Sequence, residues 1–167
     1  MIRPDGKIKP LSYFLNQGYS RPDAIKLTAQ QLKGKKVVTT SNTDMEQGVA
    51  AAARKGGLSF KDDIEIINLN PDEGLAAFLT DTKGEYAAYI GGIPQRTRAG
   101  REGMIEMLTG IDLGPAPING IVSTKEFYRN HKNEITKILK VWFKIVNYVE
   151  NNKNEAAAII VKKLNET

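Results

Sequence analysis

The sequence predicts an α/β fold in which a mostly parallel sheet is flanked by helices. Three strand-like segments, of which residues 35–40 are rich in β-branched side chains and residues 63–69 mostly alternate, with the third at residues 85–90, are separated by two segments of helical periodicity. Strands and helices that alternate over short links are typical of right-handed βαβ units, whose strands pair in parallel. The last third of the chain carries two amphipathic helical segments. Their apolar faces need a sheet or another lobe to pack against.

The composition fits a globular domain and narrows the range of functions. The 167 residues are 41% hydrophobic and 26% charged, and none is cysteine. Disulfides, thiolate nucleophiles and cysteine-based zinc sites are therefore excluded. The net charge is +5, but the basic residues are dispersed and not interleaved with aromatic side chains, so we expect no nucleic-acid partner. The residues after Met1 lack the apolar core of a secretory signal. A chain from which such a signal has been removed would look the same, so this absence does not indicate a compartment.

The first 33 residues are broken by proline and glycine. A brief helix is expected over Leu11–Asn16, because Gly18 suits the left-handed position after a helix end. A short strand is expected at residues 24–27. A segment so interrupted should pack on another part of the protein rather than form its own core.

Capping residues predict where the next helices begin and end. Thr43 stands three residues before Glu46, which is the capping-box spacing, so a helix should start at Asp44. Gly56 or Gly57 should end it. A second helix over residues 71–81 should follow Asn70 as N-cap and Pro71 at its first position.

The later elements are predicted from apolar spacing. The expectations are a short helix within residues 95–110 that stops at Gly110, a returning strand at 118–123, a short helix capped by Ser123 or Thr124, and amphipathic helices at 132–150 and 155–164.

Polar residues follow the first strand, at the edge of a parallel sheet where ligands are usually held. Thr40, Ser41, Asn42 and Thr43 are four hydrogen-bonding side chains in a row beside the free N–H groups of a helix. Simple capping would require only Thr43 and at most Ser41. Asp44 complements the helix dipole without any ligand; if it faces a pocket, it favours a ligand with an amine or a ring N–H.

Two further turns complete the candidate ligand site. Gly92 and Ile93 follow the third strand, where glycine permits close approach of the backbone to a ligand. Asn119 enters the returning strand. The expected ligand-binding residues are thus Thr40, Ser41, Asn42, Thr43, Asp44, Gly92, Ile93 and Asn119.

Catalysis finds little support in the sequence. The single histidine, His131, lies in a polar turn with no nucleophile or orienting carboxylate placed beside it. No phosphate-binding glycine loop, dinucleotide fingerprint or nucleophile elbow occurs. We therefore expect no catalytic residues, no metal ligands and no cofactor.

Three segments together resemble a known family. Residues 32–37 (LKGKKV), residues 57–80 (GLSFKDDIEIINLNPDEGLAAFLT) and the run from residue 118 to residue 164 are similar, in the same order, to periplasmic substrate-binding proteins of ABC transporters. The similarity is to the nitrate/sulfonate/taurine and thiamine-precursor group. This similarity covers residues 32–164. It rests on the order of the three segments along the chain, because no single motif among them is diagnostic.

The resemblance implies a lobe of the periplasmic-binding-protein type II kind that closes with a second lobe on a small organic or oxyanionic solute. Residues 1–33 would be a remnant of the first lobe or a connector, residues 34–118 the second lobe, and residues 119–167 the returning strand and C-terminal helices. The implied partner is the membrane permease of an ABC transporter. The implied location is periplasmic or extracellular. The resemblance is compatible with a lipid anchor on the full-length protein.

Because most of the first lobe is missing from this pattern, the chain is expected to be a fragment, and the apolar C-terminal helices are expected to promote self-association. Two alternatives remain at this point. One is an enzyme of the related pyrimidine-synthase type, and the other is the effector-sensing domain of a transcription regulator.

Overall fold

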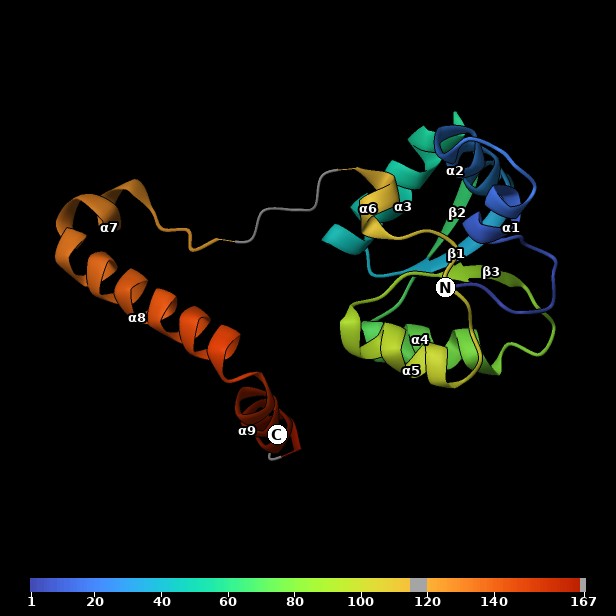
Figure 1. Ribbon diagram of the computed structural model, residues 1–167. Coiled ribbons are helices and arrows are strands. Elements are labelled where there is room, and N and C mark those ends of the chain that lie inside the picture. Colours follow the sequence, from blue (N-terminus) through green and yellow to red (C-terminus); the bar gives the residue numbers. More distant parts are fainter. Residues whose placement is uncertain (115–119, 166–167) are drawn as a thin grey trace. The chain divides into compact units, whose positions relative to one another are not determined.

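The computed structural model describes residues 1–114 and 120–165, which belong to two compact units (Figure 1). The elements of the first unit are α1 (Leu11–Asn16), α2 (Arg21–Gln30), β1 (Lys35–Thr39), α3 (Asp44–Gly56), β2 (Ile64–Asn68), α4 (Pro71–Thr80), β3 (Tyr86–Tyr89), α5 (Ile93–Arg101) and α6 (Gly110–Leu113). The elements of the second unit are α7 (Lys125–Asn130), α8 (Lys132–Asn151) and α9 (Lys153–Asn165).

The three strands form a parallel sheet in the order β2-β1-β3. Val37 of β1 stands opposite Ile66 of β2 and Ala88 of β3. The predicted strand–helix–strand–helix–strand order and the parallel pairing are confirmed. Since β1 lies in the middle, its last residues are buried, and the segments that follow β1 and β3 emerge side by side at one edge of the sheet.

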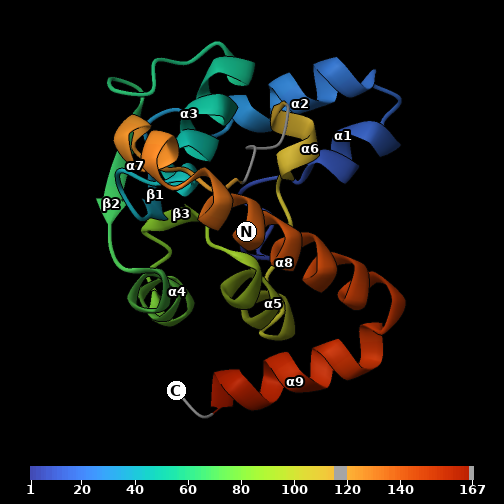
Figure 2. The ribbon, with the colours of Figure 1, turned by 90° about the vertical axis from the view of Figure 1, so that its left-hand side faces the viewer.

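Helices cover both faces of this sheet. Figures 1 and 2 show α4 and α5 on one face and α3 with α1, α2 and α6 on the other. Successive β1 side chains point to opposite faces, so Val37 joins the core under α3 and Val38 joins the core with Leu75 and Phe78 of α4. The unit therefore has a core on each side of the sheet.

Helix α3 begins at Asp44, as predicted. The Thr43 hydroxyl caps it by accepting a hydrogen bond from the Met45 amide at 3.2 Å. The capping box is modified, because the Glu46 carboxylate accepts from the Asn42 amide at 2.9 Å rather than from Thr43. Gly57 ends the helix with φ +70°, the left-handed conformation expected there.

The strand expected at residues 24–27 is wrong, because this segment lies inside α2. Ser20 caps α2 by accepting from the Asp23 amide, and Pro22 occupies the first turn. A four-residue segment with three apolar residues, Ala24, Ile25 and Leu27, does not by itself distinguish a strand from a helix. The helix Leu11–Asn16 is confirmed, and Gly18 follows it with φ +86°.

The helix expected within residues 95–110 is only partly correct. α5 starts earlier, at Ile93, and ends at Arg101. Ile105 instead forms an antiparallel bridge with Ile2, since the apolar side chains from Met104 onwards pack toward the two cores. Gly110 starts α6 rather than ending a helix.

The described residues of the second unit, 120–165, form three consecutive helices. Thr124 caps α7 by accepting from the Phe127 amide at 3.1 Å, as expected, and α7 and α9 each contact α8. Of the expected returning strand, residues 120–123 are not in a strand and residues 118 and 119 lie outside the described part. Within this unit Ile138, Trp142 and Ile145 of α8 keep about half of their surface exposed. None of the helices in the described ranges is both long and apolar enough to cross a membrane.

Candidate functional site

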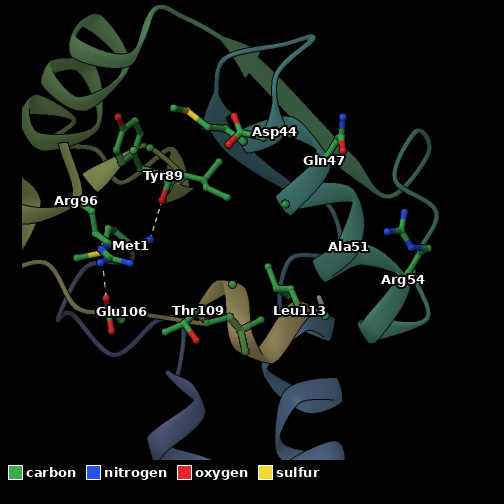
Figure 3. Close-up of a pocket in the computed structure, with 18 residues that line it drawn as sticks. Met1, Asp44, Gln47, Ala51, Arg54, Tyr89, Arg96, Glu106, Thr109 and Leu113 are labelled. Atoms are coloured by element: carbon green, nitrogen blue, oxygen red, sulfur yellow. Dashed lines mark hydrogen bonds and ion pairs between the residues drawn. The ribbon is translucent and has the colours of Figure 1, made fainter. Parts of the chain in front are cut away.

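A pocket of about 460 Å³ opens in the first unit where β1 and β3 end (Figure 3). Its walls come from α3, from the turn between β3 and α5, and from residues 106–114. Parallel sheets hold ligands beyond the carboxyl ends of their strands, and a volume of this size accommodates a small organic molecule. This pocket is therefore the candidate site.

One face of α3 forms the first wall. Asp44, Gln47, Gly48, Ala51 and Arg54 line the pocket, at the spacing of three and four residues that places side chains on one helix face. Gly48 allows close packing here, because a Cβ at this position would lie 2.7 Å from the Cδ1 atom of Ile90. Along α3 this wall thus has an acidic residue at Asp44, small residues at Gly48 and Ala51, and a basic residue at Arg54.

The opposite side carries an ion pair. The Arg96 Nε atom lies 3.6 Å from the Glu106 Oε1 atom. The amino group of Met1, next to this pair, donates to the Tyr89 carbonyl at 2.7 Å, and Figure 3 shows both contacts. Burial, aided by Arg96 and opposed by Glu106, lowers the pKa of that amino group to about 6. The amino group and the Arg96–Glu106 pair therefore add little net charge to the pocket at pH 7.

Gly91 shapes the floor of the pocket. A Cβ at Gly91 would lie 2.6 Å from Cζ and 2.8 Å from Cε1 of Tyr89. The Tyr89 ring is held in place because its hydroxyl donates to the Pro71 carbonyl at 2.8 Å and its face stacks on Phe78. Burial, together with Asp72 and against Arg98, raises the pKa of Tyr89 to about 12, so this side chain is a neutral structural group.

The polar turn after β1 is closed by its own hydrogen bonds. The Thr40 hydroxyl donates to the Leu69 carbonyl at 2.8 Å, and the Thr43 hydroxyl donates to the Thr40 carbonyl at 2.6 Å. The Ser41 amide donates to the Asn68 side-chain oxygen at 2.9 Å. With the Asn42 amide held by a carboxylate of α3, these groups stabilise the turn itself.

The structure separates the residues proposed from the sequence into three groups. Asp44 and Gly92 line the pocket, whereas the other proposed residues of these two turns are not among its lining residues. Those others are Thr40, Ser41, Asn42, Thr43 and Ile93. Asn119 lies outside the described residues.

Several lining residues were not anticipated. Gln47, Gly48 and Ala51 follow from Asp44 by the three- and four-residue spacing of a helix face, so the sequence held the signal for them. Thr109 and Leu113 had no such signal, because contacts with distant parts of the sequence, such as the antiparallel bridge between Ile2 and Ile105, hold their segment in place.

A parallel sheet with helices on both faces and a pocket at its carboxyl edge is the architecture of open α/β folds, among them the lobes of periplasmic binding proteins. The chain is similar to a solved structure of this class, the periplasmic aliphatic sulphonate binding protein SsuA from Escherichia coli, with a TM-score of 0.70 and 19% sequence identity. The similarity covers 98% of this chain and 49% of that chain. The chain thus has the fold of this class and spans about half the length of that protein.

No protein-family model matches the chain, and none of the curated proteins matches its sequence. The structural similarity therefore establishes the fold, and the pocket must carry any argument about the ligand.

Proposed function

We propose that the chain is a solute-binding component of an importer, which holds a small organic solute in the pocket at the carboxyl edge of its sheet without transforming it. The observation that carries this proposal is the pocket of about 460 Å³ between α3 and the turn after β3. Its position is the one at which open α/β sheets bind ligands. The sulphonate-binding protein of similar fold supports the same role.

The lining favours binding over catalysis. Among the described residues that form the pocket there is no histidine, cysteine, serine or lysine. His131, the single histidine, stacks on the Phe127 ring with 4.5 Å between centroids, in the second unit. The Thr109 hydroxyl in that lining donates to Asp112 at 2.7 Å, but this contact is the capping box at the start of α6, so the pair has a structural role.

The remaining parts of this proposal rest on the fold. They are a membrane permease of an ABC transporter as partner, and a periplasmic or extracellular location. A solute-binding receptor needs both, since it captures its ligand outside the cytoplasmic membrane and delivers it to a channel within it.

Amide chemical shifts of the 167-residue chain test the binding role. Addition of a panel of small organic solutes of both charges should shift the amides of residues 44–48 and 91–92 for at least one solute. A variant Ala51→Phe, which fills the middle of the pocket, should abolish these shifts while its other amides keep their positions. A panel without any response, or a response that survives Ala51→Phe unchanged, would rule out this pocket as the binding site.

A further inference from the structure

The charge at the beginning of α3, where Asp44 lines the pocket, distinguishes between classes of solute. The Asp44 side chain is exposed, and its carboxylate has no hydrogen bond or ion pair within the described residues. Glu46 adds a second negative charge in the same helical turn. Two carboxylates outweigh the roughly half unit of positive charge that a helix N-terminus contributes, so the local field is negative.

The cations of the pocket do not neutralise Asp44. Arg96 is paired with Glu106 at 3.6 Å. Arg54 lies ten residues further along α3, which is about 15 Å along the helix axis at 1.5 Å per residue. At that separation solvent and salt screen most of its interaction with Asp44.

The turn that could have served as an anion site is already occupied by the protein's own groups. The Asn42 amide donates to Glu46, the Ser41 amide donates to Asn68, and the Met45 amide donates to the Thr43 hydroxyl. An oxyanion would have to displace these contacts and approach two carboxylates. The free energy lost with these hydrogen bonds and through repulsion by the carboxylates would exceed the stabilisation that the helix dipole supplies.

Apolar groups lie beside this charge. Met45, Ile90, Leu108 and Leu113 line the same pocket, and together they can cover an aliphatic or aromatic body of a solute. We propose that the solute of this pocket is a small organic cation, whose protonated nitrogen pairs with Asp44 and whose apolar body contacts these four side chains, and that it is not an oxyanion. This inference rests on the proposed function and specifies its solute class.

Two probes that share a butyl group but carry head groups of opposite charge test the inference. Butylammonium and butanesulfonate are titrated separately into the 15N-labelled 167-residue chain, and the shifts of amides 44–48 and 91–92 are followed. Butylammonium should shift them, and butanesulfonate at the same concentration should not. Asp44→Asn should weaken butylammonium binding about three- to tenfold, the loss of a partly exposed ion pair, whereas the same charge change at the exposed Glu102, Glu102→Gln, should leave it unaltered.

Three outcomes would contradict the proposal that the solute is a cation. A response to butanesulfonate alone, or a butylammonium affinity that Asp44→Asn leaves unchanged, overturns the cation assignment and leaves the pocket as a binding site. Failure of both probes also overturns it. The wider solute panel then decides separately whether the pocket binds solutes at all, so the two failures are distinguishable.

Discussion

Replacement of Gly91 by alanine should destabilise the first unit through Tyr89. The added Cβ would lie 2.6 Å from the Tyr89 Cζ atom, and real Cβ atoms do not approach that closely. The ring has little room to yield, because Tyr89 is 1% exposed, stacks on Phe78 and donates to the Pro71 carbonyl at 2.8 Å. The backbone of the β3–α5 turn must therefore move, or the ring must leave its position.

The size of this effect follows from the two contributions. Overpacking of a filled core costs about 1–3 kcal/mol. If the ring shifts enough to break the bond to Pro71, a further loss of about 1 kcal/mol is added. We expect Gly91→Ala to lower the free energy of unfolding by about 2–3 kcal/mol. Urea unfolding followed by far-UV circular dichroism measures the change, and hydrogen exchange of the Val38 and Tyr89 amides locates it in the sheet.

The neighbouring glycine is a matched control. A Cβ at Gly92 would lie 3.4 Å from the nearest atom, on Gln95, and 3.6 Å from the Met45 Cε atom, which are ordinary contacts. Its φ of −67° suits alanine. Gly92→Ala should therefore change the free energy of unfolding by less than about 0.5 kcal/mol. Alanine is a poorer N-cap than glycine, but it also reduces the conformational entropy of the unfolded chain, and these two effects oppose each other. Equal effects of the two substitutions, or a stable Gly91→Ala protein, would refute the argument.

Substitutions at three further positions test other features. The Thr39 hydroxyl is buried and has no hydrogen-bond partner in the described part of the chain, so Thr39→Val should raise the free energy of unfolding by about 1 kcal/mol in urea titrations; a loss instead would point to a bound water there. Asn42 has φ +61°, so Asn42→Val should cost about 1–2 kcal/mol in thermal unfolding and Asn42→Gly almost nothing, and equal losses would contradict the strain. Burial alone would raise the pKa of Asp112, but hydrogen bonds from Thr109 and the Arg21 guanidinium outweigh it and hold the pKa below the usual value of 3.8. The carboxylate therefore stabilises the fold above pH 4 and loses this effect as the pH falls through its lowered pKa. Asp112→Asn should thus cost about 1–2 kcal/mol at pH 7, with a difference from the unsubstituted protein that shrinks in acid, and a pH-independent difference would exclude the charge as its cause.

Local signals predicted the sheet and α3 correctly. The β-branched run before Thr40 and the cap at Thr43 depend on neighbours within a few residues, and such neighbours are visible in the sequence. The segment at residues 24–27 was misassigned because three apolar residues within four positions fit either a strand or a helix. Ser20, which caps α2 three residues before Asp23, and Pro22 in the first turn are local signals of the same kind, and they favour the helix.

The site was less predictable than the fold. Asp44 could be proposed because strand ends in parallel sheets attract ligands, and its helix face follows from periodicity. Leu108 and Thr109 could not, since their place beside the pocket depends on pairing between residues 2 and 105. Periodicity also cannot show that a polar turn such as residues 40–43 consumes its own hydrogen-bonding groups.

That pairing between the two ends of the first unit has a consequence for folding during synthesis. The ribosome delivers β1, α3 and β2 early, and these neighbours can associate at once because few residues separate them. Met1 and Ile2 must wait, since their partners Tyr89 and Ile105 are translated about 88 and 103 residues later. The pocket wall formed by residues 106–114 depends on the same late step. A nascent chain therefore assembles part of its sheet before it completes the pocket.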